Sequence, residues 1–503
     1  IDMYTFSSKL KTFSLILMAV GLLGIGYGFY SAPKDIQAVE KFLASEGHGS
    51  NHGPAQAVEA HAPVIEAPAA TEVSHDTAKV ETSNEVAHTE TVVNDSIAAP
   101  AVVEPVHATT VTHAVGGEHK VNAEAEHTEH LEHVLHQLQN KPWAALYVAC
   151  IFFLLVTLGV LAFYAIQQVA QSGWSPVLFR VMQGITAYLP VGSVIFFIIL
   201  VICGLHIFDS NHLFVWLSEG ITDPTKPNFD KLIANKSGYL NFPFWIIRAA
   251  IFLIGWNLYR YFSRKNCLAQ DEATDDSFYK KNFKMSAGFL VFFIVTESIM
   301  SWDWIMSIDP HWFSTLFGWY VFASFIVSAV TTICLVTLYL KSKGYLEHVN
   351  TSHIHDLAKF MFGFSVFWTY LWFSQFMLIW YADIPEEITY FVTRIQLYNL
   401  PFFGAVVMNF VFPLLILINT DFKRISWVLV MAGTVILLGH YIDFFNMIMP
   451  GTVGDQWFIG VSEIASVLFF LGLFIYVVFT ALTKAPLLPK RNPFIEESKH
   501  FHY

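Results

Sequence analysis

The stretch from Trp143 to Ala170, WAALYVACIFFLLVTLGVLAFYAIQQVA, decides the class of fold. It contains no Asp, Glu, Lys or Arg. A helix rises about 1.5 Å per residue, so about 20 mostly apolar residues cross a hydrocarbon layer about 30 Å thick. The stretch is long enough, and we predict a membrane-spanning helix.

Nine further stretches share this length and apolar character, so we predict an all-α integral membrane protein with ten transmembrane helices. The first follows Lys9 and Lys11 as the core of a signal peptide would, but Pro33 stands where cleavage would occur, and we expect an uncleaved anchor. The ten stretches run from Phe13 to Tyr30, Trp143 to Ala170, Val191 to Phe208, Phe244 to Tyr261, Met285 to Trp304, Leu316 to Leu340, Phe360 to Tyr381, Leu400 to Ile418, Trp427 to Met449 and Phe458 to Leu482.

The composition agrees with a lipid environment. Charged residues make up 14% of the chain, against about 25% in an ordinary soluble domain. The formal charge of −12 arises in residues 33–141, which hold 17 of the 40 acidic residues and 5 of the 28 basic ones. The rest is neutral, so the acidity indicates neither a nucleic-acid partner nor a charged substrate. The four cysteines form no C-x-x-C pair, which argues against a disulfide framework, a zinc site or an iron–sulfur cluster.

Basic residues indicate the orientation, because they accumulate on the cytoplasmic side of short loops. If the N-terminus is cytoplasmic, the segments on that side hold eighteen Lys and Arg residues. The short outer loops then hold four, namely Lys226, Lys231, Lys236 and Arg394. This asymmetry predicts that both termini are cytoplasmic.

Residues 33–141 then lie outside the membrane, in the periplasm. They contain 12 of the 21 His and almost no aromatic residue, so we predict a His/Ala/Glu-rich, largely disordered tether. The His spacing is irregular and forms no metal motif. Four apolar residues between Leu131 and Leu138 share one helical face, which predicts an amphipathic helix leading into the second span.

The segment from Gly173 to Leu189 connects the second and third spans. Arg180 is its one charged residue, and its neighbours are mostly apolar. We expect this segment to lie along the cytoplasmic interface of the membrane.

Ionisable residues inside the spans are the candidate functional residues. A charge in hydrocarbon costs about 2.5 to 3.5 kcal/mol on insertion scales, so each needs a partner or a purpose. Counted along the helices they concentrate in the outer half, where a carboxylate or imidazole could accept protons and pass them outward. The candidates are His206 and Asp209 on the third span, Arg248 on the fourth, Glu297, Ser301 and Asp303 on the fifth, and, as secondary proton-path candidates, His440 and Asp443 on the ninth and Glu463 on the tenth.

Helical spacing supports local pairs but leaves their role open. Glu297 lies four residues before Ser301, and His440 lies three before Asp443, so each pair can face one cavity. Both can equally serve structure. Arg248 can form a buried ion pair with Glu297, and His440 can share a hydrogen bond with Asp443.

Two aromatic-rich stretches carry a family resemblance. The first reads SIMSWDWIMSIDPHWFSTLFGWYVFAS from Ser298 to Ser324, and the second reads FWTYLWFSQFMLIWYADIPEE from Phe367 to Glu387. They resemble the signature stretches of NrfD-type (polysulfide reductase membrane anchor) subunits of alternative complex III, the quinol:cytochrome c oxidoreductase of bacteria that lack a cytochrome bc1 complex. The Ser-Gln-Phe and Trp-Tyr-Ala-Asp-Ile-Pro-Glu-Glu runs are most similar to the second of its two such subunits. The resemblance covers about Trp143 to Leu482.

The resemblance implies an architecture of two four-helix bundles plus flanking helices. The expected parts are an N-terminal anchor helix (1–32), the periplasmic tether (33–141), a first bundle (142–304), a second bundle (314–449), and a last transmembrane helix with a cytoplasmic tail (456–503). It also implies a location in the bacterial inner membrane.

The resemblance also implies partners. They are a multihaem cytochrome c subunit, an iron–sulfur subunit, a sister NrfD-type subunit, small membrane anchors and a terminal oxidase. The metals then belong to the partners, and a quinone or quinol and bound lipids are the ligands expected of this chain. His206 and His440 permit at most one bis-His haem, and we expect none.

The function expected from the resemblance is a part in quinol:cytochrome c oxidoreductase activity, with no self-sufficient activity of the chain alone. In the family a quinol site lies near the outer face of the first bundle, and the first-bundle candidates match it by location. Because the sister subunit is the better candidate for the working site, this chain can also serve as a scaffold or proton path. A purely structural subunit and a secondary transporter are the alternatives. Transporters have paired broken helices, whereas Pro413 has no evident counterpart.

Overall fold

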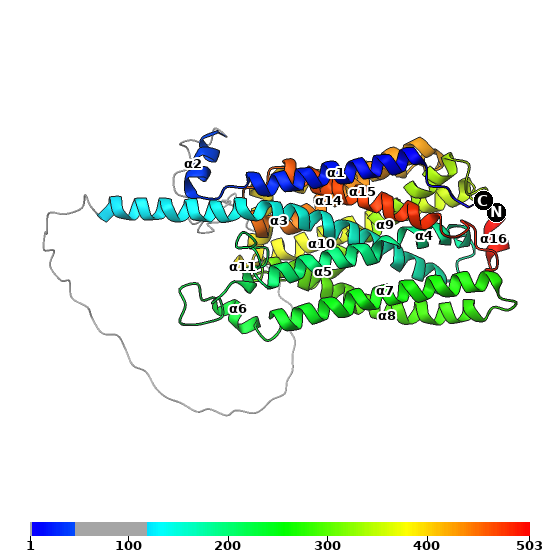
Figure 1. The fold of residues 1–503 in the computed structure, drawn as a ribbon, viewed down its shortest axis with the longest axis horizontal. Coiled ribbons are helices and arrows are strands. Elements are labelled where there is room, and N and C mark those ends of the chain that lie inside the picture. The colour runs from blue at the N-terminus through cyan, green and yellow to red at the C-terminus, as the bar shows by residue number, and fades with distance from the viewer. Residues whose placement is uncertain (1–2, 46–117, 503) are drawn as a thin grey trace, which may run out of the picture. The chain divides into compact units, whose positions relative to one another are not determined.

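The computed structural model describes residues 3–45 and 118–502, with the backbone alone for residues 118–126. Its regular elements are all helical (Figure 1), and ten helical stretches are long and apolar enough to cross a membrane. The ten predicted spans and the all-α class are therefore confirmed, whereas the disorder predicted within residues 33–141 lies mainly outside the described residues. The elements are α1 (Ser8–Ser31), α2 (Ile36–Ser45), α3 (Glu118–Val169), η1 (Pro176–Leu178), α4 (Phe179–Ile185), α5 (Tyr188–Gly204), η2 (Val215–Leu217), α6 (Lys231–Lys236), α7 (Phe242–Glu272), α8 (Ser277–Trp304), η3 (Met306–Ile308), α9 (Phe317–Ser342), α10 (Thr351–Ala382), α11 (Pro385–Gln396), α12 (Asn399–Val406), η4 (Val407–Val411), α13 (Phe412–Leu417), η5 (Phe422–Arg424), α14 (Ser426–Val453), α15 (Val461–Leu482) and α16 (Ile495–Lys499).

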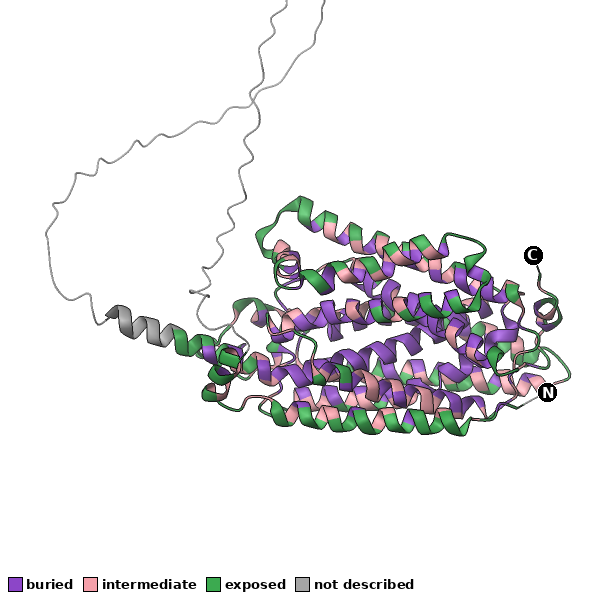
Figure 2. Cartoon of the chain, turned by 90° about the horizontal axis from the view of Figure 1, so that it is seen from above, coloured by how far each residue is buried: buried purple, intermediate pink, exposed green. Residues whose placement is uncertain are grey.

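Helix α3 lies in the middle of the spans. In its most apolar window 94% of the residues are buried, against 17% for α1 (Figure 2). The Tyr147 hydroxyl of α3 donates to the Trp304 carbonyl of α8 at 2.6 Å. On the side facing α14, the Phe152 ring contacts the ring of Phe444. The stretch that decided the fold class therefore packs against protein rather than lipid.

The other spans pack in pairs around α3. Helix α7 packs along α8 and α5, while α9 packs along α10 and α14. Helices α8 and α9 join these groups where Gly318 approaches α8, because a Cβ on Gly318 would lie 3.1 Å from the Ser298 Cα. The division into two four-helix bundles at the predicted boundaries stays a prediction.

Helix α1 packs against α15, the last span. Three glycines of α1 face this helix, and a Cβ on Gly21 would lie 2.4 Å from the Phe469 backbone nitrogen. A Cβ on Gly24 would lie 2.5 Å from the Cβ of Ala465. Small residues let two helix backbones approach closely in a membrane. The first and last spans therefore form one closely packed pair.

The helix ends define two sides of the spanning unit, which we name the termini side and the loop side. On the termini side, Thr5 contacts Tyr345, and Asn350 donates to the Phe501 carbonyl at 2.6 Å. The loop side holds the connections of residues 205–241 and 383–398. Both chain ends thus lie on one side (Figure 1), as an even number of spans requires.

On the loop side, α2 packs on the start of α3. Val39 of α2 is fully buried against Leu131, Val134 and Leu138 of α3. These residues share one helical face, so the predicted amphipathic helix is confirmed. It continues into the second span without a break.

The prediction for residues 173–189 is wrong. All seven residues of α4 are buried, and α4 packs against α9 and α15 rather than along a membrane interface. Arg180 enters this buried position because its guanidinium pairs with Asp271 of α7 at 2.5 Å. Burial of a charge that is paired and hydrogen-bonded costs much less free energy than burial of an unpaired charge.

The eighth span is irregular, since α12, η4 and α13 follow one another and η4 is a π-helical turn. Pro413 stands just after this turn and cannot donate a backbone hydrogen bond. Asn409 of η4 is fully buried, and both polar atoms of its side chain lack a hydrogen-bond partner. A π-turn of this kind often accompanies a functional position.

Candidate functional site

The nine candidate residues differ in their surroundings. Seven of them are buried, and His206 and Asp209 are exposed. The buried ones fall into four separate groups, around Asp303, Glu297, Asp443 and Glu463. Different partners offset the free-energy cost of burying the polar side chains in each group.

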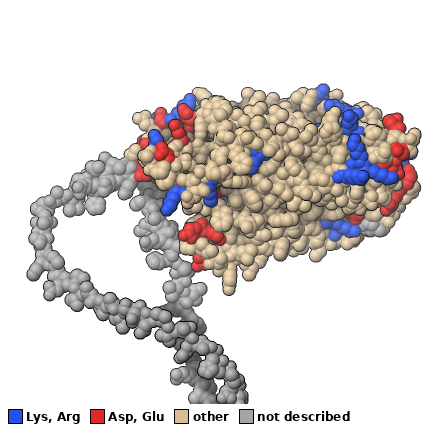
Figure 3. All heavy atoms as spheres, turned by 90° about the horizontal axis from the view of Figure 1, so that it is seen from below, with Lys and Arg blue, Asp and Glu red and all other residues tan. Residues whose placement is uncertain are grey.

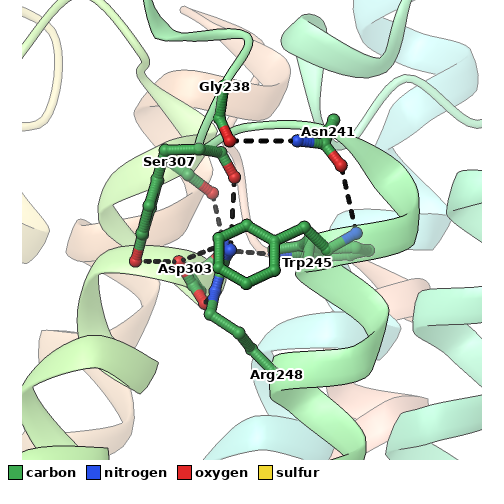
Figure 4. A network of polar contacts seen from close by, with 8 residues as sticks. Gly238, Asn241, Trp245, Arg248, Asp303 and Ser307 are labelled. Atoms are coloured by element: carbon green, nitrogen blue, oxygen red, sulfur yellow. Dashed lines mark hydrogen bonds and ion pairs between the residues drawn. The ribbon is translucent and has the colours of Figure 1, made fainter.

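Asp303 forms a two-point ion pair with Arg248 (Figure 4). The Arg248 Nε donates to Asp303 Oδ2 at 2.6 Å, and Nη2 donates to Oδ1 at 3.0 Å. The parallel geometry of guanidinium and carboxylate makes this the strong form of the pair. The sequence leaves open an ion pair of Arg248 with Glu297, and that alternative is wrong, because the guanidinium pairs with Asp303.

Three neighbours complete the Asp303 group. The Tyr239 hydroxyl donates to Asp303 Oδ1 at 2.7 Å, while the Trp245 indole and the Ser307 hydroxyl donate to the Asp303 carbonyl at 2.9 and 2.6 Å. Burial, and then the carboxylate of Asp303, raise the pKa of Tyr239, so this hydroxyl keeps its proton. Both carboxylate oxygens of Asp303 accept hydrogen bonds. The group therefore joins α7, α8 and the loop that precedes α7 (Figure 4).

The local sequence fixes the position of Arg248. Asn241 precedes α7 as its N-cap, and its side chain accepts from the Phe244 backbone N–H at 3.0 Å. Pro243 occupies the first turn, where its missing N–H costs nothing. Helix α7 therefore begins at a defined residue, and Arg248 projects from its second turn toward the end of α8.

Glu297 is buried one and a half turns before Asp303 on α8, with 4% of its surface exposed. It accepts from the Ser301 hydroxyl at 3.2 Å and from the Ser298 hydroxyl at 3.3 Å. The predicted pairing with Ser301 is therefore present. No cation among the described residues forms an ion pair with Glu297. A buried carboxyl with two neutral donors is suited to binding and releasing a proton.

Asp443 of α14 is surrounded by three donors from other helices. The Tyr320 and Ser324 hydroxyls of α9 and the Trp368 indole of α10 all donate to its carboxylate. The Ser324 and Trp368 contacts measure 2.7 and 2.8 Å. Neutral donors thus take the place that Arg248 has beside Asp303. We name these residues, with His440, the Asp443 cluster.

His440 meets Asp443 through Ser324 rather than directly. Its Nδ1 lies 4.0 Å from Asp443 Oδ2 but 2.9 Å from the Ser324 hydroxyl. The Nε2 atom is buried and has no hydrogen-bond partner.

A pocket lies on the loop side between η3, α9, α11 and α14. Its lining includes Trp312, Tyr390 and Arg394. The Trp312 ring stacks on Tyr390 at 3.8 Å, and Arg394 donates to the Tyr390 and Asn446 carbonyls at 2.8 and 3.1 Å. Burial raises the pKa of Tyr390. Tyr390 and Arg394 both lie within electrostatic range of Tyr320, so the pocket adjoins the Asp443 cluster.

Glu463 caps a helix. Its Oε2 accepts from the Gly460 backbone N–H at 2.9 Å at the start of α15, and its Oε1 lies 3.9 Å from the Lys141 ammonium of α3. This carboxylate caps a helix N-terminus and lies near an ammonium, while its Oε1 has no hydrogen-bond partner. The cap and the nearby charge account for its position.

His206 and Asp209 do not lie inside the third span. Helix α5 ends at Gly204, and both side chains are exposed in the connection that follows. His206 Nε2 lies 2.8 Å from the Leu217 carbonyl, which anchors this connection. The prediction that His206 and Asp209 belong to the third span is therefore wrong, because the helix ends one turn earlier than the apolar run.

The structure adds residues that sequence reasoning missed. Tyr320, Ser324 and Trp368 hold Asp443, and Tyr239 holds Asp303. Tyr320, Ser324 and Ser328 recur every four residues on α9, a polar stripe that could have indicated one buried face. Among the described residues, no three His, Cys, Asp or Glu side chains are grouped so that they could hold a metal ion.

Comparison with known proteins leaves the family open. No family model matches the chain, and no curated protein matches it. The established description is therefore that of a ten-helix, multi-pass membrane protein with buried polar groups near the loop side.

Proposed function

We propose that this chain is an integral membrane subunit of a quinol:cytochrome c oxidoreductase complex, in which it contributes to quinol binding, proton handling or scaffolding. Support comes from the two stretches that resemble NrfD-type subunits. Residues 298–324 contribute Asp303, Tyr320 and Ser324, and residues 367–387 contribute Trp368. The resembling stretches thus supply Asp303 itself and the three side chains that donate to Asp443.

The observation that carries the proposal is Glu297. A carboxyl buried in a span without a cation partner is costly, and proton exchange is a purpose that accounts for it. Oxidation of a quinol yields a quinone, two protons and two electrons. In this proposal Glu297 accepts the two hydroxyl protons in turn and passes each one outward before it accepts the next, and metal centres of the partner subunits take both electrons. Arg248 and Asp303 position α8 rather than exchange protons.

The Asp443 cluster is the second proton-handling candidate. Tyr320 donates to its buried carboxylate, and Tyr320 lies near Tyr390 and Arg394 of the pocket on the loop side. In the proposed orientation the loop side is periplasmic and both termini are cytoplasmic. Protons leaving through this pocket would then be released outside the bacterial inner membrane.

The first test is isolation of the native complex through a tag on this chain. We expect the isolate to contain a multihaem cytochrome c subunit and an iron–sulfur subunit, and to show quinol:cytochrome c activity. A chain that isolates without haem proteins and without this activity would overturn the proposal.

The second test is Glu297→Gln in the assembled complex. Removal of a proton acceptor costs about 10²- to 10⁴-fold in rate for a group in general base catalysis, so we expect at least a tenfold loss of turnover with unchanged subunit content. The matched control is Glu347→Gln, an exposed carboxylate on the termini side. Unchanged turnover in Glu297→Gln would remove this residue from the quinol site and leave scaffolding as the role of this chain.

A secondary transporter is the alternative that the eighth span raises. Its π-turn and unpartnered Asn409 resemble a broken helix of the kind that binds substrates. Transporters place such breaks in pairs, whereas η4 is the one π-turn among the described helices. We therefore favour the respiratory subunit.

A further inference from the structure

Three arginines gather on the termini side of α4 and α7. Arg180, Arg260 and Arg264 are close enough that the charge of Arg264 acts on Arg260 and the charge of Arg180 acts on Arg264. One carboxylate, Asp271, pairs with Arg180 at 2.5 Å. The other two guanidinium groups carry positive charge that this carboxylate does not balance.

Arg260 and Arg264 have few partners in the protein. Arg264 Nη1 reaches the Gln183 carbonyl at 3.4 Å, the long limit of a hydrogen bond. The Nε of Arg260 is buried without a hydrogen-bond partner. Within the described part of the chain, no carboxylate forms an ion pair with either. Two adjacent, partly desolvated cations without an anion are unfavourable, so an anion from outside the chain would stabilise them.

The two arginines lie one helical turn apart at the inner boundary of a span. Two and six residues before Arg260 on α7, Leu258 and Ile254 are exposed. The Asn257 amide donates to the Ser193 hydroxyl at 2.9 Å and joins α7 to α5, where Val194 is exposed. Exposed apolar side chains of α5 and α7 thus precede the arginines along the span.

We propose that Arg260 and Arg264 bind the phosphate of an anionic phospholipid whose acyl chains lie along α5 and α7. A guanidinium pairs with phosphate through two parallel hydrogen bonds. The exposed apolar side chains of α5 and α7 supply the place for acyl chains that a free phosphate would not need. An anionic headgroup balances both charges, whereas a zwitterionic one brings its own cation.

The surrounding surface favours the same ligand. Figure 3 views the molecule from the side of α7 and α8 and shows Lys and Arg atoms gathered in a band toward the termini side. Exposed lysines in this region include Lys265, Lys280 and Lys281. Such a band attracts anionic lipids of the cytoplasmic leaflet. The inference depends on the membrane-spanning fold and stands whether or not the proposed function is correct.

The test measures phospholipid retained by the protein when it is purified from its native membrane, alone or with any partners. Lipids are extracted after exchange into mild detergent and quantified per chain by mass spectrometry. The variant Arg260→Gln with Arg264→Gln is compared with Lys280→Gln with Lys281→Gln, which removes the same charge from exposed positions. We expect at least fivefold less phosphatidylglycerol or cardiolipin in the arginine variant and wild-type retention in the lysine variant.

A thermal-shift experiment distinguishes the source of the anion. Phosphatidylglycerol should raise the unfolding temperature of the wild type but not of the arginine variant, and phosphatidylcholine or inorganic phosphate should raise neither. Equal retention in both variants, or an equal shift with inorganic phosphate, would overturn the proposal. A wild-type complex that retains no anionic lipid would overturn it too, and would indicate an acidic segment of a neighbouring subunit instead. If the double variant does not assemble, Arg260→Gln alone should show a partial loss of lipid.

Discussion

At the scale of single residues, the two buried aspartates are stabilised in opposite ways. Asp303 has a guanidinium, while Asp443 has three neutral donors from α9 and α10. An ion pair fixes the charge of Asp303. Neutral donors hold either form of Asp443, because a hydroxyl can turn from donor to acceptor when the carboxyl takes up a proton. The Asp443 cluster is therefore better suited to change its protonation state.

This difference predicts the effect of Asp443→Asn. The amide offers one acceptor oxygen where three donors converge, and its own N–H₂ group faces other donors. A buried polar group left unpaired costs about 1 to 3 kcal/mol, and we expect this loss in the free energy of unfolding in detergent. Tyr320→Phe removes one donor and should cost less, about 1 kcal/mol. A variant Asp443→Asn as stable as the wild type would contradict the geometry described for the cluster.

The candidate residues could be found from sequence, but their partners could not. Hydropathy shows that Glu297 and Asp303 interrupt an apolar run, and helical spacing relates Glu297 to Ser301. Neither hydropathy nor helical spacing indicates which residue of a neighbouring helix lies beside a candidate. The sequence therefore allows an ion pair of Arg248 with Glu297, although the end of α8 places Asp303 against the guanidinium. The prediction for His206 is wrong for another reason: the apolar run in the sequence continues past the residue where its helix ends.

At the scale of elements, the contact between α1 and α15 depends on missing side chains. Gly21 lies against the α15 backbone, whereas a Cβ on Gly26 would meet open space. We expect Gly21→Leu to cost about 1 to 3 kcal/mol through overpacking, and Gly26→Leu to leave stability unchanged. Thermal unfolding of the two variants side by side measures this. Equal stability would show that α1 is not held by this contact.

The connection between α5 and α7 predicts a pH dependence. His212 lies 3.3 Å from His136 of α3, ring nitrogen to ring nitrogen. Burial, then His136 and His206, lower the pKa of His212, while Asp209 opposes them. Because the folded-state pKa lies below about 6.5, the stability from neutral His212 is fully present above that pH and is lost as pH falls through the folded value. The unfolding temperature should therefore fall between about pH 7 and pH 5, and less so in His212→Gln. An identical pH profile in that variant would contradict this assignment.

At the scale of the whole molecule, ten spans and the side shared by both termini followed from hydropathy and length, because burial in lipid is a local property of each segment. The central place of α3 and the burial of α4 depend on packing between distant segments, so sequence pattern did not predict them. Orientation is the remaining whole-molecule prediction. A C-terminal fluorescent protein should be bright and a C-terminal alkaline phosphatase inactive, as for a cytoplasmic tail. The reverse result would place the loop side in the cytoplasm and end the case for outward proton release.

The pairing of α1 with α15 bears on biogenesis. The ribosome synthesises α1 before α15, so the surface that packs against the α1 glycines is made only with the tenth span. Until then α1 lies in lipid without its partner, and the contact between α1 and α15 is not formed. This contact cannot form without α15, so a chain truncated before Val461 should expose α1 to membrane quality-control proteases, however well the spans between α1 and α15 have assembled.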